Sequence, residues 1–319
     1  MSTLTTSQAA IQVTKLHKSF GQTKAVQGVS FDVQPGEIFS LLGPNGAGKT
    51  TTISMLSTLL RPDEGDARVC GHSIRRQPMA VKAVLGVVPQ ELALYEDLSA
   101  RENLDFWGKM YGLRGAALGR RIDEVLDTIG LRERAKERVG KYSGGMKRRV
   151  NIGVALLHKP RVIYMDEPTV GIDPQSRRNI LDSVVALKDQ GMTVLYTTHY
   201  MEEAQELSDH IAIMDHGRLI ASGTHDELVQ LVGQETRIDL RLDVPAGRVL
   251  EAWQAAEGVL RVSADEEGHI TVFVKDSNLV LPGLFEAARS HAARITSVDI
   301  HEPDLETVFL HLTGRALRD

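Results

Sequence analysis

The run from Gly43 to Thr50, Gly-Pro-Asn-Gly-Ala-Gly-Lys-Thr, constrains this chain more than any other feature. It fits the phosphate-loop pattern G-x-x-x-x-G-K-[ST], in which glycines let successive backbone N–H groups point at one anion. The apolar run 38–42 before it indicates a buried strand, and apolar residues at helical spacing from Ile53 to Leu60 indicate a helix after it. Phosphate binds well where such a loop meets a helix N-terminus, so the sequence predicts a nucleotide site.

A second group of candidate residues follows the apolar run 162–165, which indicates another buried strand. Asp166 and Glu167 come directly after it. We expect Asp166 to hold Mg²⁺ together with the Thr50 hydroxyl, because that ion prefers oxygen ligands. Glu167 is the candidate to orient and deprotonate a water in line with the terminal phosphate, and Lys49 would add positive charge against the outer phosphates.

Composition and charge narrow the function classes. The 319 residues carry a formal net charge of −5, which gives no reason to expect nucleic acid or an anionic lipid surface as a partner. A single cysteine, Cys70, excludes an internal disulfide framework and fits a reducing compartment. No apolar run approaches the about 20 residues that span a bilayer, so we expect any membrane span to belong to another chain. Residues 1–10 lack the shape of a secretory signal and are expected to form a flexible N-terminus.

The first two thirds of the chain alternate between strand and helix patterns. This alternation predicts a parallel sheet covered on both faces, the α/β class. A polar stretch, 98–141, is rich in helical patterns, and a hairpin is expected across the turn 215–217. The expected strands are 11–16, 26–33, 38–42, 161–165, 193–197, 211–214 and 218–221, and the expected later helices are 175–188, 201–208 and 226–231.

The pattern changes after Gly233, where we expect a domain boundary. Apolar residues alternate in 238–242 and 270–274, as in half-buried strands. Helical patterns occur at 249–256, 279–291 and 305–313. The resulting β-α-β-β-α-β order predicts that residues 234–319 form a small two-layer α+β accessory domain with a terminal helix, behind a nucleotide-binding domain of residues 11–233.

Between the two nucleotide motifs stands the run 142–146, Tyr-Ser-Gly-Gly-Met. A hydroxyl and bare backbone amides at a helix N-terminus make a second anion site. With phosphate loop, Ser-Gly-Gly and Asp-Glu strand in this order, the chain resembles the ATP-binding-cassette (ABC) ATPase family over about residues 11–230. Tyr142 and Met146 depart from the family's usual Leu and Gln. The resemblance implies hydrolysis of ATP to ADP and phosphate with Mg²⁺, on a P-loop ABC fold with a parallel-sheet core, an antiparallel β subdomain and a helical subdomain at about 91–158.

Four further motifs match the family in its order along the chain. Gln90 resembles the glutamine that reaches Mg²⁺ and the attacking water, and His199 resembles the switch histidine that contacts the terminal phosphate. Asp173 lies in a run similar to the loop that links two active sites, and Phe20 stands where the family stacks an aromatic ring on adenine. The resemblance thus implies catalytic roles for Glu167, His199, Gln90 and Lys49, magnesium contacts by Thr50, Gln90 and Asp166, and ATP contacts by Phe20, Gly43, Pro44, Asn45, Gly46, Ala47, Gly48, Lys49, Thr50 and Thr51.

The resemblance also implies a head-to-tail pair of cassettes, either a homodimer or a dimer with another ATPase subunit. Each ATP would lie between the phosphate loop of one subunit and the Ser-Gly-Gly of the other, so closure would depend on the nucleotide. Asp173 would connect the two sites. The residues expected to contact ATP in trans are Ser143, Gly144 and Gly145.

Two stretches, 94–104 and 301–315, resemble the exporter branch served by ABC type-2 permeases, and within it the daunorubicin-resistance-type ATPases. This resemblance implies export of a drug, antibiotic or lipid-linked compound through a separate transmembrane permease, with the ATPase peripheral on the cytoplasmic face of the inner (plasma) membrane. Tyr95, Leu98 and Phe106 either receive a permease helix or simply pack the helical subdomain. The basic run 147–149 is expected to face solvent or the phosphate-site neighbours, and no direct nucleic acid contact is expected.

Three other functions remain alternatives. A non-transport cassette acting on ribosomes usually carries two cassettes, and this chain has one phosphate loop. A cassette acting on DNA inserts long coiled coils, and the interval 50–143 shows no sustained heptad repeat. A module that binds ATP without turnover would not need Glu167 and His199.

Overall fold

The computed structural model describes residues 9–231, 236–264, 269–301 and 304–313. The chain divides into two compact units, one up to His225 and the other from Asp226 onward. The expected boundary at Gly233 and residues 1–8 of the expected flexible N-terminus lie outside the described residues. No helix in the described ranges has the length and apolar character to cross a bilayer.

A six-stranded sheet forms the centre of the first unit, in the order β10-β9-β3-β8-β7-β6. Its neighbouring pairs are parallel except for the β9–β10 hairpin, so the predicted α/β alternation is confirmed. All residues of β3, β7 and β8 are buried, as in a sheet covered on both faces. The strands are β3 (Ile38–Leu42), β6 (Leu85–Val88), β7 (Val162–Asp166), β8 (Thr193–Thr198), β9 (His210–Asp215) and β10 (Arg218–Gly223).

The predicted hairpin between β9 and β10 is also observed. Asp215 pairs with Arg218, which leaves a two-residue turn of His216 and Gly217. Both turn residues have positive φ, 45° and 76°, as a type I′ turn requires. The turn thus joins β9 to β10, which is the edge strand of the sheet.

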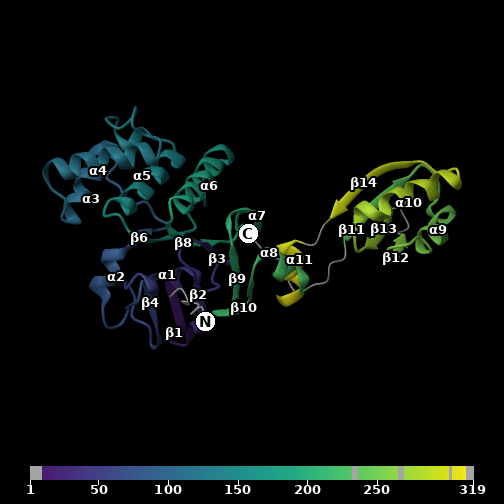
Figure 1. Ribbon diagram of the computed structural model, residues 1–319, viewed down its shortest axis with the longest axis horizontal. Coiled ribbons are helices and arrows are strands. Elements are labelled where there is room, and N and C mark those ends of the chain that lie inside the picture. Colours follow the sequence, from purple (N-terminus) through teal and green to yellow (C-terminus); the bar gives the residue numbers. More distant parts are fainter. Residues whose placement is uncertain (1–8, 232–235, 265–268, 302–303, 314–319) are drawn as a thin grey trace, which may run out of the picture. The chain divides into compact units, whose positions relative to one another are not determined.

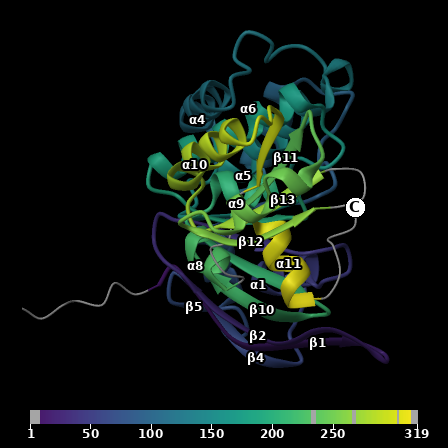
Figure 2. The same cartoon turned by 90° about the vertical axis from the view of Figure 1, so that its right-hand side faces the viewer.

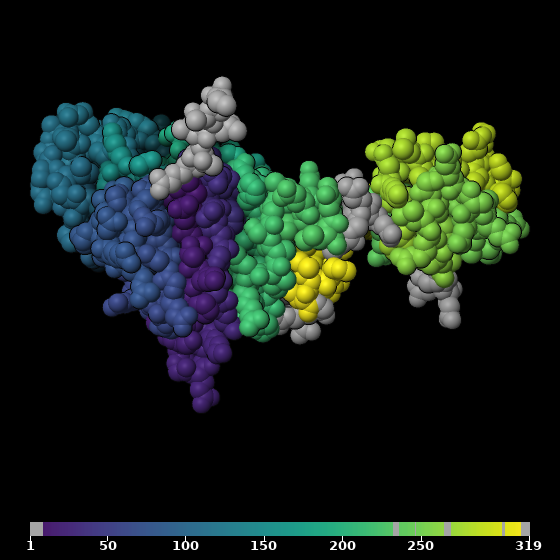
Figure 3. Space-filling model, turned by 60° about the horizontal axis from the view of Figure 1, so that its bottom comes forward, coloured from purple at the N-terminus to yellow at the C-terminus, as the bar shows by residue number. Residues whose placement is uncertain are grey.

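A second, antiparallel sheet has the order β2-β1-β4-β5. Helix α1 (Lys49–Leu56) contacts both β2 and β7, so it packs between the two sheets in the core that they share (Figure 1). Figure 3 shows the first two strands, in purple, on the surface of this unit. The strands are β1 (Ile11–Phe20), β2 (Thr23–Val33), β4 (Glu64–Val69) and β5 (His72–Ser73).

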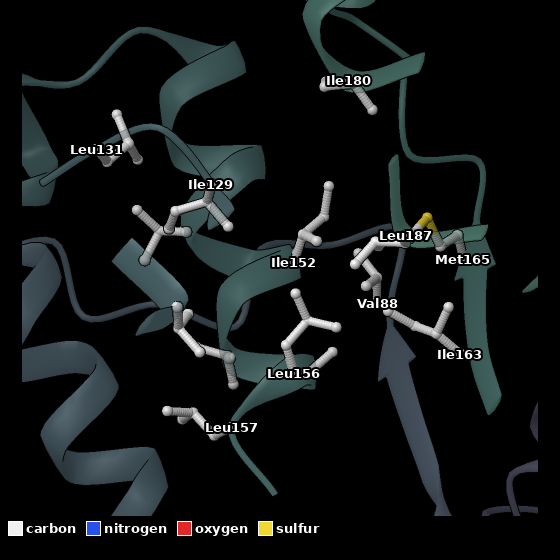
Figure 4. Close-up of a cluster of buried hydrophobic side chains, with 14 of the residues drawn as sticks. Val88, Ile129, Leu131, Ile152, Leu156, Leu157, Ile163, Met165, Ile180 and Leu187 are labelled. Carbon is white, nitrogen blue, oxygen red and sulfur yellow. The ribbon is translucent and has the colours of Figure 1, made fainter. Parts of the chain in front are cut away.

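Three helices, α3 (Ala100–Met110), α4 (Gly115–Thr128) and α5 (Gly144–Leu156), contact one another and form a helical layer. A capping box starts α3, because Ser99 and Glu102 satisfy each other's backbone N–H groups. Figure 4 shows side chains of α5, β6 and β7 meeting in one buried cluster, which joins the helical layer to the sheet. The remaining helices of this unit are α2 (Pro78–Val84), the 3₁₀ turn η1 (Val139–Lys141), α6 (Pro174–Asp189) and α7 (Met201–Leu207).

The second unit contains the predicted β-α-β-β-α-β order, followed by the predicted terminal helix. Its antiparallel sheet has the order β12-β13-β11-β14, which is the ferredoxin-like arrangement. Helices α9 and α10 share one buried core with the sheet (Figure 2). The elements are α8 (His225–Gln230), β11 (Thr236–Leu242), η2 (Ala246–Arg248), α9 (Leu250–Gln254), β12 (Val259–Ala264), β13 (His269–Val274), α10 (Ser277–Ser290), β14 (Ile295–His301) and α11 (Leu305–Thr313).

Candidate nucleotide site

The loop between β3 and α1 has the geometry of an anion site. Gly48 has φ of 100°, and a Cβ there would lie 2.4 Å from the Ala25 carbonyl oxygen, so only glycine fits. Within the described ranges, no side chain caps the start of helix α1 at Lys49. The backbone N–H groups at this helix start are therefore available to a phosphate.

The Lys49 side chain is buried, and its ammonium lies among oxygen atoms. Nζ donates to the carbonyls of Gly43 and Pro44 at 2.6 and 3.1 Å, and it lies 3.0 Å from Oε1 of Glu167. An ammonium has three donors, so all of them are occupied. A phosphate that binds Lys49 must therefore exchange with one of these partners.

Asp166, at the end of β7, faces Thr50 from α1. The Thr50 hydroxyl donates to Oδ1 of Asp166 at 3.2 Å, and the Thr197 hydroxyl donates to the same oxygen at 2.7 Å. Burial raises the pKa of this carboxyl, while the hydrogen bonds from Thr197 and Thr50 oppose the rise. A carboxylate and a hydroxyl side by side are suitable oxygen ligands for Mg²⁺.

Glu167 occupies a strained backbone position, with φ of 44°. Its N–H donates to Oγ1 of Thr197 at 3.0 Å, which fixes the residue against β8. The carboxylate lies between Lys49 and His199, with Oε2 3.3 Å from Nδ1 of the histidine. That Nδ1 is buried and makes no hydrogen bond within the described residues. This strained backbone conformation therefore places the buried Glu167 carboxylate beside Lys49 and His199.

These residues border a cavity of about 730 Å³. Phe20 lies at the cavity with 52% of its surface exposed, as a ring available for stacking would be. His199 and Asp166 do not line the cavity directly but contact residues that do. The lining residues are Phe20, Gln22, Thr23, Lys24, Ala25, Gln27, Asn45, Gly46, Gly48, Lys49, Thr50, Thr51, Gln90, Glu167 and His216.

The Ser-Gly-Gly run and Asp173 are not among the lining residues of this cavity. Ser143 caps α5 by accepting the Met146 N–H, and Asp173 caps α6 by accepting the Ser176 N–H. A Cβ on Gly145 would lie 2.3 Å from Cβ of Ser176, so the two caps pack closely together. The chain thus presents the start of α5 and the start of α6 as neighbours, away from its own phosphate loop.

Glu203 on α7 is a site residue that sequence reasoning missed. Its buried carboxylate accepts hydrogen bonds from the hydroxyls of Thr169, Tyr196 and Thr198 at 2.6 to 2.9 Å. Arg177 of α6 completes the set, with Nε 3.7 Å from the same carboxylate. Glu203 therefore connects the segment that follows β7 with the end of β8, and both adjoin the other site residues.

Of the two positions expected for the basic run 147–149, solvent or the neighbours of the phosphate site, Arg148 occupies the second, beside Gln90 of the cavity. This side chain is only 4% exposed, and its guanidinium donates to backbone carbonyls. Lys147 pairs with Glu96, and Arg149 donates to the Ile129 carbonyl at 3.2 Å. The position of Arg148 on α5 directs it towards the protein interior and the loop that carries Gln90.

Comparison with known proteins identifies the family. A family model described as "ABC transporter" matches residues 26–170. The linearmycin resistance ATP-binding protein LnrL of Bacillus subtilis (strain 168) is 47% identical over 310 residues, which cover 97% of this chain and 100% of that protein. This chain belongs to the ABC transporter family.

Further relatives of this ABC ATPase agree with the predicted branch. The daunorubicin resistance ATP-binding protein DrrA3 of Streptomyces coeruleorubidus is 40% identical, with 96% of each chain covered. A solved structure of an ATP binding subunit of an ABC transporter matches with a TM-score of 0.63 at 31% identity, covering 70% of this chain and 93% of the other. The predicted resemblance and the P-loop ABC fold are confirmed, and the activity of the ABC ATPase is ATP binding and hydrolysis.

Proposed function

We propose that this ABC ATPase powers export of a drug, antibiotic or lipid-linked compound through a separate membrane permease. The resistance proteins for linearmycin and daunorubicin align over at least 96% of this chain and of their own length, which supports a common role. In that role the chain is a peripheral subunit on the cytoplasmic face of the inner membrane. ATP hydrolysis supplies the free energy, and the permease determines the path of the exported molecule.

We infer that ATP lies in the cavity beside the phosphate loop. Its adenine stacks on Phe20, and its phosphates meet the backbone of residues 43–51 and the Lys49 ammonium. The oxygens of Thr50, Gln90 and Asp166 are suited to Mg²⁺, which neutralises phosphate charge when bound. The close approach of the Thr50 hydroxyl to the Asp166 carboxylate is the feature that fits this ion.

Glu167 is the proposed general base. Binding of phosphate to Lys49 removes the partner of Oε1, and the freed carboxylate can then accept a proton from water. Nδ1 of His199 lies 3.3 Å from Oε2 of Glu167, so this ring can hold the carboxylate in place beside the terminal phosphate. Gln90, across the cavity, would orient the water.

Two subunits are proposed to close head to tail over the nucleotide. Ser143, Gly144 and Gly145 of one subunit would contact the ATP held by the other, and Asp173 would connect the two sites. The placement of these residues away from the chain's own phosphate cavity supports an action in trans. The partner is either a second copy or another ATPase subunit of the same kind.

The permease would dock on the helical layer near Tyr95, Leu98 and Phe106. The rings of Tyr95 and Phe106 pack edge to face at 5.0 Å, yet they remain 49% and 37% exposed. Leu98 is half-buried beside the start of α3. An exposed aromatic pair is suited to an apolar helix from a membrane partner.

The observation that carries the proposed mechanism is the buried Glu167 carboxylate between Lys49 and His199. We expect Glu167→Gln to keep ATP binding, to lose more than 99% of hydrolysis, and to accumulate a dimer in MgATP, because the amide cannot accept the proton. Nucleotide titration, phosphate release and light scattering after gel filtration measure these three properties. Glu133→Gln, an exposed change in the loop after α4, is the control. Near-normal turnover by Glu167→Gln would exclude Glu167 as the base.

A further inference from the structure

Arg148 is buried one turn into α5, the helix that starts with the Ser-Gly-Gly run. Its Nη1 donates to the Pro89 carbonyl at 2.8 Å, and its Nη2 donates to the Gln90 carbonyl at 2.7 Å. A buried guanidinium needs such partners, and its planar fork suits two neighbouring acceptors. The bonds are charge-assisted and therefore stronger than ordinary amide hydrogen bonds.

No carboxylate forms an ion pair with Arg148 in the described part of the chain, and its Nε has no hydrogen-bond partner there. Burial lowers the pKa of the guanidinium, so the side chain occupies its site at a desolvation cost. The hydrogen bonds to the two loop carbonyls are thus the main interactions that offset this desolvation cost. A side chain with this arrangement joins two segments rather than neutralising a charge.

Asn151, on the same face of α5 and one turn further on, strengthens the same connection. It is 2% exposed, and its Oδ1 accepts the backbone N–H of Ala93 at 3.3 Å. Its Nδ2 lies 3.5 Å from the Pro89 carbonyl oxygen, at the outer limit of a hydrogen bond. The loop 89–93 is therefore held to α5 at both of its ends.

Gln90 lines the nucleotide cavity, while its own carbonyl is held by Arg148. The N-terminus of the same helix carries Ser143, Gly144 and Gly145. We propose that Arg148 is a positioning residue that couples Gln90 to α5, so that nucleotide in the cavity sets the position of the surface offered to the second ATP. This inference rests on the proposed closure of two subunits.

The experiment compares Arg148→Met with Arg149→Met, the neighbouring arginine that donates to Ile129 instead of the loop. Both are made in full-length protein carrying Glu167→Gln, and each is tested for ATP binding and for MgATP-induced dimer. We expect Arg148→Met to bind ATP within about twofold of its parent but to need at least tenfold more MgATP to form the dimer. Arg148→Lys, which keeps the charge and can keep one of the two hydrogen bonds to the loop carbonyls, should recover part of that loss. Arg149→Met should behave as the parent.

The outcomes separate this inference from the function on which it rests. Absence of a dimer in the Glu167→Gln parent, with its permease supplied, would overturn the proposed closure itself. A dimerising parent with an equally responsive Arg148→Met would overturn the coupling alone. Hydrogen exchange on the parent gives a test that needs no Arg148 variant: MgATP should protect residues 89–93 and 144–151 over the same concentration range, and protection of one segment without the other contradicts the inference.

Discussion

Lys49 and Glu167 stabilise each other before nucleotide arrives. Both side chains are at most 5% exposed, and they are 3.0 Å apart. The ammonium offsets part of the cost of burying a carboxylate in a position where an isolated charge would be costly. In the proposed mechanism, phosphate takes the ammonium, and Glu167 loses this partner when a base is needed beside the terminal phosphate. The ion pair would thus link binding to activation of the water.

Asp166 carries a cost of a different kind, because its raised pKa means that the folded chain binds a proton more tightly than the unfolded chain. The stability that this carboxyl contributes is fully present below pH 3.8, the ordinary pKa of the group. It is lost as the pH rises through the raised pKa of the folded chain. Asp166→Asn removes the ionisation and keeps an oxygen for Thr50 and Thr197. We expect the variant to unfold at a higher temperature than wild type at neutral pH, without nucleotide or magnesium, and the gain to disappear towards pH 3.8.

Thermal unfolding over a pH series measures this difference, with Asp97→Asn, an exposed change, as the control. The same variant should lose magnesium-dependent hydrolysis. A lower unfolding temperature at neutral pH would contradict the destabilising burial of the charge.

Residues with a chemical pattern could be found from the sequence, and residues that act through buried contacts could not. Lys49 and Glu167 each stand beside a strand pattern, so their proximity follows from a parallel sheet. Arg148 stood in a basic run expected to face solvent or the phosphate-site neighbours, and Glu203 stood in an expected helix without any motif. Arg148 bonds to Gln90, 58 residues earlier in the sequence, and Glu203 bonds to Thr169, 34 residues earlier. No local sequence pattern reveals such contacts.

Helix α7 is short, but Glu203 gives it a structural role at the site. Glu203→Ala leaves the hydroxyls of Thr169, Tyr196 and Thr198 without their acceptor, which should cost about 3 kcal/mol of unfolding free energy. We also expect a fall in kcat larger than the change in KM, because Thr198 precedes His199 and Thr169 follows Glu167 by two positions. Urea unfolding and steady-state hydrolysis measure the two effects.

Glu203→Gln preserves the shape and one acceptor oxygen, so it should lose less than half as much stability as Glu203→Ala. The adjacent Glu202 is exposed, and Glu202→Ala serves as the matched control. If Glu203→Ala and Glu202→Ala unfold at the same urea concentration, the hydrogen bonds to α7 do not stabilise the site.

Strands β1 and β5, which the sequence predicted only in part or not at all, have an irregular or very short pattern. Lys15 has positive φ, and the β1–β2 register shifts beside it, so the alternation of apolar residues breaks within one strand. This is why β1 was expected to end at 16 but continues to Phe20. Strand β5 has only two residues, too few for any periodic signal.

At the scale of the whole molecule, the site follows from strand order. Strands β3, β8, β7 and β6 are neighbours in the sheet, and the segments after them carry Gly43, His199, Glu167 and Gln90. In parallel sheets, ligands bind at the carboxyl ends of the strands. Four motifs spread over more than 150 residues therefore meet at one edge.

The second unit has a core of its own, and its stability can be separated from nucleotide binding. Trp253 is fully buried there, and its Nε1 donates to the Leu284 carbonyl at 3.0 Å. All members of this core lie between residues 238 and 298, whereas the nucleotide cavity is lined by residues 20–216. Trp253→Ala should therefore destabilise the second unit by about 3–5 kcal/mol while ATP affinity stays within about twofold.

Hydrogen exchange checks this separation, because the amides of β11 and β13 should exchange faster in Trp253→Ala while those of β3 and β7 keep their protection. Trp107, the other tryptophan of the chain, packs against a core of the first unit and provides the matched change. Trp107→Ala should speed exchange in α3 and α4 and leave β11 and β13 as they are. If Trp253→Ala instead lowers protection throughout β3 and β7, or weakens ATP binding tenfold, the two units fold as one cooperative body and the accessory domain contributes to the nucleotide site.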